Sequence, residues 1–301
     1  MPPIISTTTG IAGVVPAIVT PIDGAGAPDA LAFLDLAAWL LADGADGLNV
    51  LGTTGEATSF STAQRLSLMR AVGRSSLPHE RLMVGTGAAA VADAVTLTQV
   101  AAGEGFAGAL LLPPFYYKGV PEDGIVRYID TIATATRESA IPLYLYNFPA
   151  MAGVAYAVPL VERLIKLFGE RIAGLKDSSG DLAYARAVAA LSNSLKVFPS
   201  NEASLMEARD GPFAGCISAS AGVNAALCAR AFRAGDERAL DAAVRIRKLF
   251  DGLPFVPAVK GALAQRLGKP SLAAVQPPFV ELPEARAKAL AQAIEGIHAE
   301  T

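Results

Sequence analysis

The sequence predicts an α/β protein, a (β/α)8 TIM barrel with a C-terminal helical extension. Short apolar segments with turn-rich ends alternate with stretches of helical period over roughly 220 residues. Eight such segments match the eight strands of a barrel, and a doubly wound sheet is the alternative. After the eighth segment the strand pattern stops and only helical stretches follow. We therefore expect the barrel over residues 1–224 and the helical region over residues 225–301.

The expected strands are short apolar runs bounded by glycine, proline or polar residues. They lie at residues 13–20, 48–52, 82–87, 109–112, 143–146, 172–176, 196–199 and 215–220. Helices are expected between them at 30–41, 62–74, 91–102, 124–137, 159–168 and 182–191, and in the tail at 225–234, 237–250, 257–266 and 283–298. The tail could cap the barrel or mediate contact between subunits.

Composition excludes several classes of protein. A chain of 301 residues that is 52% hydrophobic can bury a large core. Its net charge of −3, with acidic and basic residues interspersed, argues against binding to nucleic acid or an anionic membrane. The first ten residues lack the cationic start and apolar core of a signal sequence, and no apolar stretch is long enough to span a bilayer, so a cytoplasmic location is expected.

Metal chemistry and histidine triads are not expected. The chain has two histidines, His79 and His298, which are too few for a multi-histidine site. Its two cysteines, Cys216 and Cys228, have no metal-binding spacing and are best interpreted as small buried apolar residues. The chemistry should therefore depend on other side chains.

Lys176 ends the apolar run Ile-Ala-Gly-Leu and is followed by Asp-Ser-Ser-Gly-Asp. A lysine at the carboxyl end of a buried strand is partly removed from water. Desolvation disfavours the charged form of its amine, so this position favours the neutral form, which is the nucleophile. Lys176 is therefore the candidate nucleophile. The alternative is an ordinary strand-end lysine that reaches solvent.

Tyr146 is the last tyrosine of the preceding expected strand. Alternation places Tyr144 and Tyr146 on one face and Leu143 and Leu145 on the other. Consecutive strands of a parallel sheet are usually neighbours, so Tyr146 and Lys176 should meet at the same carboxyl edge. A phenol beside an amine can transfer protons, although a core tyrosine with a satisfied hydroxyl is the commoner case.

A third segment, Gly-Thr-Thr-Gly-Glu at residues 52–56, follows the second expected strand. Its glycines permit a tight turn, and its amides together with the hydroxyls of Thr53 and Thr54 can surround a small carboxylate. The alternative is that these residues only form a tight turn. The segment lacks the spacing of a nucleotide phosphate loop.

These three segments together resemble the dihydrodipicolinate synthase and N-acetylneuraminate lyase family. The motifs are Gly-Thr-Thr-Gly-Glu at 52–56, Tyr-Asn-Phe-Pro at 146–149 and Gly-Leu-Lys-Asp-Ser-Ser-Gly-Asp at 174–181, and the resemblance extends from residue 13 through the helical tail. It implies a class I aldolase barrel, usually a homotetramer, in which a lysine forms a Schiff base with pyruvate or another 2-oxo acid. No cofactor beyond this covalent imine is implied.

The resemblance also assigns roles to residues of the three motifs. Lys176 would form the imine, and Tyr146 would shuttle protons at the substrate. Thr53 and Thr54 would hold the carboxylate of the 2-oxo acid. Thr54 would also belong to the hydrogen-bonded relay that ends at Tyr146.

Further roles follow from weaker matches. In the segment Pro-Phe-Tyr-Tyr at 114–117, Tyr117 resembles the tyrosine that crosses into a neighbouring subunit to complete the relay, with Tyr116 as the alternative. Ile217 matches a position whose backbone lies beside the bound keto acid. Asp181 is expected to cap the helix that follows it, whereas Asp177 could contact substrate or serve as a cap.

Two departures from the family narrow the expected substrate. Synthases usually carry an arginine after the Tyr-Asn-x-Pro motif to bind the second substrate's carboxylate, but Ala150 and Met151 occupy this stretch. Sialic acid lyases typically place a Tyr-Asp-Glu set after the seventh strand, and the corresponding stretch of this chain is Ser-Asn-Glu-Ala at 200–203. Hydroxyls of a shorter sugar acid could instead bind Asn201, Glu202, Ser218 and Ser220.

We therefore expect an aldolase that cleaves a 2-keto-3-deoxy sugar acid to pyruvate and a small hydroxyaldehyde. A 2-keto-3-deoxy acid dehydratase is the nearest alternative, followed by N-acetylneuraminate lyase and 4-hydroxy-tetrahydrodipicolinate synthase. A sensor that binds a 2-oxo acid without turnover is disfavoured by the intact set of Lys176, Tyr146 and Thr54. A pyridoxal phosphate enzyme is disfavoured because no phosphate loop follows strands seven and eight.

Overall fold

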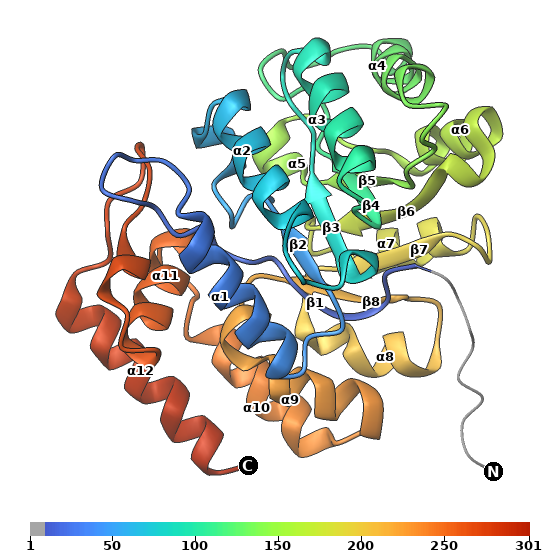
Figure 1. The fold of residues 1–301 in the computed structure, drawn as a ribbon. Helices are drawn as coiled ribbons and strands as arrows, with labels where there is room; N and C mark the ends of the chain where they lie inside the picture. The colour runs from blue at the N-terminus through green and yellow to red at the C-terminus, as the bar shows by residue number, and fades with distance from the viewer. Residues whose placement is uncertain (1–9) are drawn as a thin grey trace.

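The fold is that of a computed structural model, which describes residues 10–301. The residues considered for a signal sequence lie almost entirely outside this range. Within it, eight parallel strands form a curled sheet with helices packed outside it (Figure 1). The strands are β1 (Gly13–Pro16), β2 (Leu48–Val50), β3 (Leu82–Gly85), β4 (Gly108–Leu111), β5 (Leu143–Asn147), β6 (Ile172–Asp177), β7 (Lys196–Pro199) and β8 (Gly215–Ser218).

The strands pair in chain order but not as one continuous ladder. Strands β2 to β7 form a six-stranded sheet, and β1 pairs with β8. A single bridge between Ala17 and Asn49 joins β1 to β2, and the Ala214 amide donates to the Val197 carbonyl, 2.9 Å away, beside β7 and β8. The α/β class with a parallel sheet is confirmed, whereas the uninterrupted eight-stranded ladder of the expected barrel is broken at these two seams.

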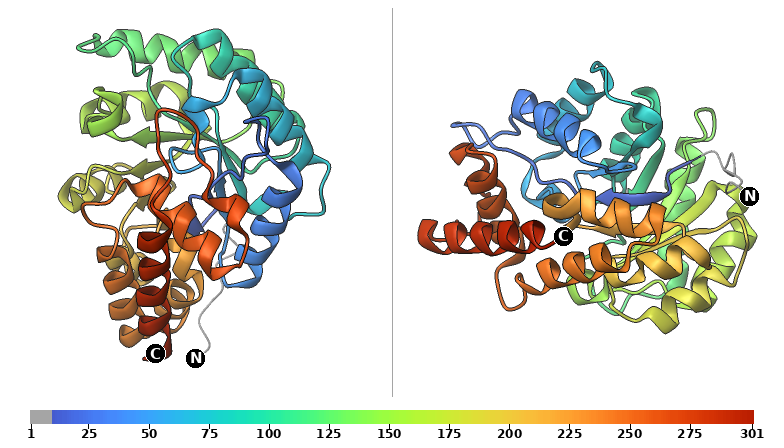
Figure 2. Two further views of the ribbon diagram at one scale, coloured as in Figure 1. Left: turned by 90° about the vertical axis from the view of Figure 1, so that its left-hand side faces the viewer. Right: turned by 90° about the horizontal axis from the view of Figure 1, so that it is seen from below.

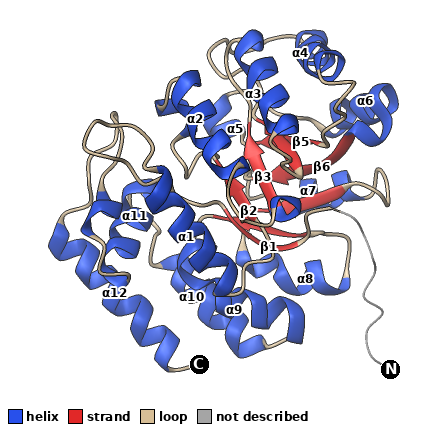
Figure 3. Cartoon of the chain, in the orientation of Figure 1, coloured by secondary structure: helices blue, strands red, loops and turns tan. Residues whose placement is uncertain are grey.

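Helices follow the strands in alternation and cover the outside of the sheet (Figure 3). They are α1 (Ala30–Ala42), α2 (Thr62–Gly73), α3 (Val91–Gly103), α4 (Glu122–Ala135), α6 (Val158–Phe168) and α7 (Leu182–Ala189). Two short helices were not predicted, α5 (Pro149–Ala152) and α8 (Leu205–Asp210). Both lie in loops at the carboxyl ends of strands, where a helical period is too short to recognise in sequence.

The C-terminal helices are α9 (Ala221–Ala234), α10 (Glu237–Lys248), α11 (Phe255–Arg266) and α12 (Glu284–Ala299). No strand separates them in the described chain, as predicted. Helix α9 packs against β1, and the boundary expected at residue 224 falls inside it, at a kink where Asn224 has φ −146°. Both views of Figure 2 show α11 and α12 on one flank, away from α4 and α6. The described part of the chain has no helix long and apolar enough to cross a membrane.

The buried apolar residues form two clusters. The larger lies between the sheet and the helices, and a smaller one lies within the curl of the sheet and includes Met83, Tyr144 and Phe198. Gly174 of β6 allows this inner packing, because a Cβ there would lie 2.7 Å from the Tyr144 ring and 2.2 Å from the Lys196 carbonyl oxygen. The glycine two residues before Lys176 therefore lets β6 fit against Tyr144.

Candidate active site

Lys176 and Tyr146 are paired in register on the neighbouring strands β6 and β5. Both side chains are buried, and the Lys176 Nζ lies 4.4 Å from the centroid of the Tyr146 ring. The adjacency predicted from strand order is confirmed. Both residues lie at the carboxyl end of their strands, which is where parallel α/β barrels place their reactive groups.

The Tyr146 hydroxyl has two hydroxyl neighbours. Its oxygen lies 3.3 Å from the Thr53 Oγ1, and the Ser178 Oγ donates to it over 3.5 Å. The hydrogen bond to Tyr146 that was expected of Thr54 is therefore made by Thr53. Thr54 is buried and lines the same pocket.

The 52–56 loop takes its shape from unusual backbone angles and a buried ion pair. Leu51 and Glu56 have φ values of 49° and 53°, a left-handed conformation that residues with a Cβ adopt rarely. The Glu56 carboxylate accepts a hydrogen bond from the Lys260 Nζ of α11 at 2.5 Å, and both side chains are fully buried. Burial lowers the pKa of Lys260, and the Glu56 charge opposes that shift. The helical tail thus holds the loop that carries Thr53 and Thr54.

Asp177 and Asp181 order the loop after β6. The Asp177 carboxylate accepts hydrogen bonds from the Asn147 Nδ2 at 2.8 Å and from the Ser179 amide and hydroxyl at 3.1 and 2.9 Å. Burial raises the pKa of Asp177, and these hydrogen bonds oppose the shift. Asp181 accepts from the amides of Ala183 and Tyr184, so the predicted capping role is confirmed. Asp177 does not line the pocket.

A pocket of about 250 Å³ opens at this edge of the sheet. One part of its wall is polar and the rest is apolar. The polar residues are Thr53, Thr54, Tyr146, Lys176, Ser178, Ser200 and Arg247, and the apolar residues are Phe148, Met151, Ile217, Ala219, Phe255, Val256 and Phe279. Ile217 lines the pocket together with Lys176, and the pocket is large enough for a small organic acid.

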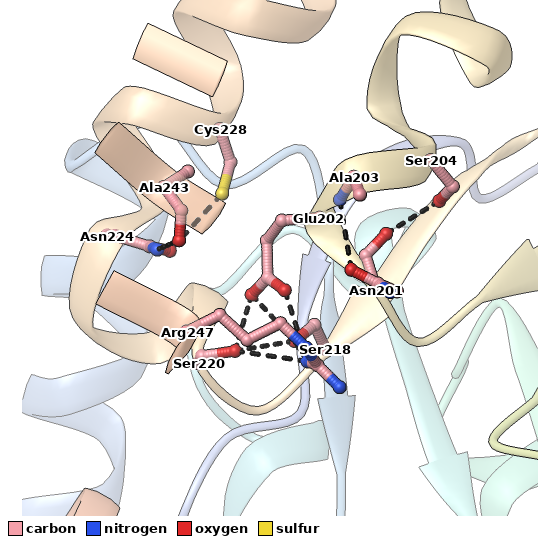
Figure 4. Close-up of polar contacts among 10 residues, drawn as sticks. All are labelled: Asn201, Glu202, Ala203, Ser204, Ser218, Ser220, Asn224, Cys228, Ala243 and Arg247. Carbon is pink, nitrogen blue, oxygen red and sulfur yellow. Dashed lines mark hydrogen bonds and ion pairs between the residues drawn. The ribbon is translucent and has the colours of Figure 1, made fainter. Parts of the chain in front are cut away.

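Glu202, which was expected to bind substrate hydroxyls, is directed into the protein instead (Figure 4). Its side chain is fully buried, and its Oε1 accepts from the hydroxyls of Ser218 and Ser220 at 2.8 and 2.5 Å. Its Oε2 lies 3.1 Å from the Arg247 Nη1. The expectation for Glu202 and Ser218 does not fit this geometry, because their polar atoms are already used and neither residue lines the pocket.

Asn201 does not line the pocket either. Its Oδ1 accepts a hydrogen bond from the Ala203 amide and caps a turn. The residue that does reach the pocket from this region is Arg247 of α10, which sequence reasoning missed. No local pattern distinguishes Arg247 from other arginines of an amphipathic helix. Once the structure shows that Glu202 is buried, a cation is expected nearby, but the sequence does not show this burial.

Tyr116 and Tyr117 lie on the surface, with 75% and 72% of their area exposed. Their rings contact each other edge to face at 5.2 Å. Neither lines the pocket within this chain. Any part they take in the relay would therefore have to be in another copy of the protein.

Known proteins are similar to this chain in sequence. Residues 10–297 match the model of the dihydrodipicolinate synthetase family. An uncharacterized DapA-like lyase of Chloroflexus aurantiacus is 31% identical over 96% of this chain and 98% of its own. A 4-hydroxy-tetrahydrodipicolinate synthase of a Synechococcus strain is 40% identical, but over only 50% of this chain and 49% of its own.

Solved structures are similar over nearly the whole chain. YagE of E. coli K12, a member of the dihydrodipicolinic acid synthase family crystallised with pyruvate, superposes with a TM-score of 0.85 at 26% identity, covering 95% of this chain and 98% of its own. A variant of the 2-keto-3-deoxygluconate aldolase of Sulfolobus solfataricus superposes with a TM-score of 0.83, covering 96% and 97%. At 21% identity the second likeness concerns the fold alone.

Proposed function

Because this chain belongs to the dihydrodipicolinate synthetase family, a family of lyases and aldolases, we propose that it is a Schiff-base-forming lyase. Its substrate is a 2-keto-3-deoxy acid, which it cleaves to pyruvate and a small aldehyde. The observation that carries the proposal is the buried Lys176 amine, 4.4 Å from the Tyr146 ring centroid in a pocket that Thr53 and Thr54 also line.

The proposed reaction starts with attack of the neutral Lys176 amine on C2 of the 2-oxo acid. The adduct then loses its C2 hydroxyl as water, using the proton of the Tyr146 hydroxyl, which leaves a protonated imine and the Tyr146 phenolate; the hydroxyls and amides of the 52–56 loop hold the carboxylate. Tyr146, as its phenolate, removes the proton of the C4 hydroxyl, and the C3–C4 bond breaks to give the aldehyde. The bond electrons form an enamine, which is protonated at C3 and hydrolysed to pyruvate and free lysine.

In this scheme the imine accepts the electrons, so we propose that no metal or further cofactor takes part. Thr53 aligns the Tyr146 hydroxyl through their 3.3 Å contact. We further propose a cytoplasmic homotetramer in which the eight strands enclose the site as a barrel. The exposed Tyr117, or Tyr116 beside it, would then complete the proton relay of a neighbouring subunit.

The test is incubation with 2-keto-3-deoxy acids, followed by assay of pyruvate and of the dehydrated keto acid. Pyruvate with an aldehyde supports the aldolase, whereas a dehydrated product of unchanged carbon count would replace it with the dehydratase.

A second candidate is 4-hydroxy-tetrahydrodipicolinate synthase. Met151 lies where synthases usually have an arginine, and this argues against that reaction. The Arg247 guanidinium, however, brings a different cation to the same pocket. Condensation of pyruvate with aspartate semialdehyde is therefore assayed alongside cleavage.

A further inference from the structure

We infer that Arg247 binds an anionic group, a carboxylate or a phosphate, at the end of the substrate that is distal to the imine. This deepens the proposed function and rests on it, because the Lys176 imine defines which end of the substrate is distal. Arg247 is supplied by α10 of the helical tail and lines the pocket together with Lys176.

Glu202 and two serine hydroxyls fix one end of the Arg247 guanidinium. Every hydrogen bond of the guanidinium within residues 10–301 uses Nη1, which contacts the Glu202 Oε2 at 3.1 Å and the hydroxyl oxygens of Ser218 and Ser220 at 3.3 Å. Figure 4 shows the other end of the guanidinium directed away from this cluster. The Nε and Nη2 donors therefore remain available to a ligand, and 31% of the side chain is exposed.

The serine hydroxyls explain how Arg247 can serve a ligand while it is paired with Glu202. Ser218 and Ser220 both donate to the Glu202 Oε1, so this buried carboxylate does not depend on Arg247 alone for its hydrogen bonds. Because the ion pair and the serines fix the guanidinium, less conformational entropy is lost when a ligand binds its open edge.

The charge of the pocket wall favours an anion over a neutral chain of hydroxyls. Lys176 and Arg247 are the cationic residues that line the pocket, and no acidic side chain in the described chain lines it. A planar guanidinium with parallel N–H donors matches a carboxylate or a phosphate. The rest of the wall includes Phe148, Phe255 and Phe279, so the middle of the substrate meets mainly apolar surface.

The test uses 2-oxo acids that differ only at their distal end, trapped on the protein with borohydride. Each dicarboxylate is compared with its uncharged match: 2-oxoglutarate with 2-oxopentanoate, 2-oxoadipate with 2-oxohexanoate, and 2-oxopimelate with 2-oxoheptanoate. The pair of 2-keto-3-deoxygluconate and its 6-phosphate distinguishes phosphate from carboxylate. Intact mass gives the concentration of each acid that half-saturates trapping.

For at least one pair we expect the distal anion to lower the half-saturating concentration about tenfold or more. Arg247→Gln should remove that difference. Arg245→Gln, which removes a surface arginine of the same helix paired with Glu300, is the matched control and should preserve the difference. The double variant Glu202→Gln/Arg247→Gln leaves no buried charge unpaired, and gives the same readout if Arg247→Gln fails to fold.

Equal half-saturation within every pair of the wild type, or a difference that persists in Arg247→Gln, would overturn the role of Arg247 while leaving the imine mechanism intact. Failure to trap even pyruvate would overturn the proposed function itself, and the role of Arg247 with it.

Discussion

Glu56 and Lys260 lie 204 positions apart in the chain, yet their charged atoms are 2.5 Å apart and neither side chain is exposed. The backbone amide of Gln276 donates to the second oxygen of the same carboxylate at 2.6 Å. The pair joins helix α11 and the segment after it to the loop at residues 52–56. The helical tail is therefore part of the structure that shapes the pocket.

Removing one partner of this pair should destabilise the protein strongly. Lys260→Met leaves the Glu56 carboxylate buried without a counter-charge and should lower the free energy of unfolding by about 3–5 kcal/mol. The double variant Lys260→Met/Glu56→Gln should recover much of this loss. Chemical denaturation measures both. Lys166→Met, which breaks an exposed pair with Glu162, is the control and should change stability by about 1 kcal/mol or less. Equal losses in the single and double variants would contradict this account.

Tyr146→Phe should separate binding from proton transfer. The substituted ring retains the apolar packing beside Lys176 but cannot exchange a proton, so turnover should fall by about 10²- to 10⁴-fold. The pyruvate adduct should still form, at a lower rate, and intact mass after borohydride treatment detects it. A turnover rate within twofold of wild type would show that another group transfers the proton.

Thr53→Val tests the hydrogen bond to Tyr146. The substitution keeps the shape of the side chain and removes the hydroxyl 3.3 Å from the Tyr146 oxygen. A loss of about 0.5–1.5 kcal/mol corresponds to a fall in turnover of several-fold. Thr54→Val, at the adjacent position, should have its main effect on the concentration of 2-oxo acid needed for saturation. If Thr54→Val lowered turnover more than Thr53→Val does, Thr54 and not Thr53 would be the relay residue.

The raised pKa of Asp177 predicts a pH dependence of stability. Because burial raises this pKa above 3.8, the folded protein binds a proton that the unfolded chain has already lost in the window just above that pH. The contribution of Asp177 to stability is therefore fully present below 3.8 and is lost as pH rises through the folded-state pKa. Asp177→Asn should remove this part of the pH dependence in denaturation curves measured from pH 3.5 upward. An unchanged slope would show that Asp177 titrates normally in the folded protein.

The pairing of Lys176 with Tyr146 could be predicted because it depends only on strand order and period. Both follow from the local apolar pattern of the chain. The choice between Thr53 and Thr54 depends on the left-handed backbone at Leu51 and Glu56, which residue propensities do not favour. The sequence therefore identified the loop but not which hydroxyl meets Tyr146.

Arg247 could not be predicted for a different reason. Its contact with Glu202 joins α10 to the turn after β7, and the packing of one helix on a distant loop leaves no trace in local periodicity. Because the sequence does not show this contact, Glu202 was assigned to substrate binding. A lone acid after a barrel strand resembles a ligand-binding group until its internal partner is known.

The most direct test of the central claim is intact mass and peptide mapping after borohydride reduction in the presence of pyruvate. We expect one reduced pyruvyl group per chain, on the peptide that contains Lys176, and none in Lys176→Ala. Lys260 is an internal control, because it is equally buried but bound to Glu56. Well-folded protein that gains no pyruvyl group, or gains it on another lysine, would contradict the assignment of Lys176 as the nucleophile.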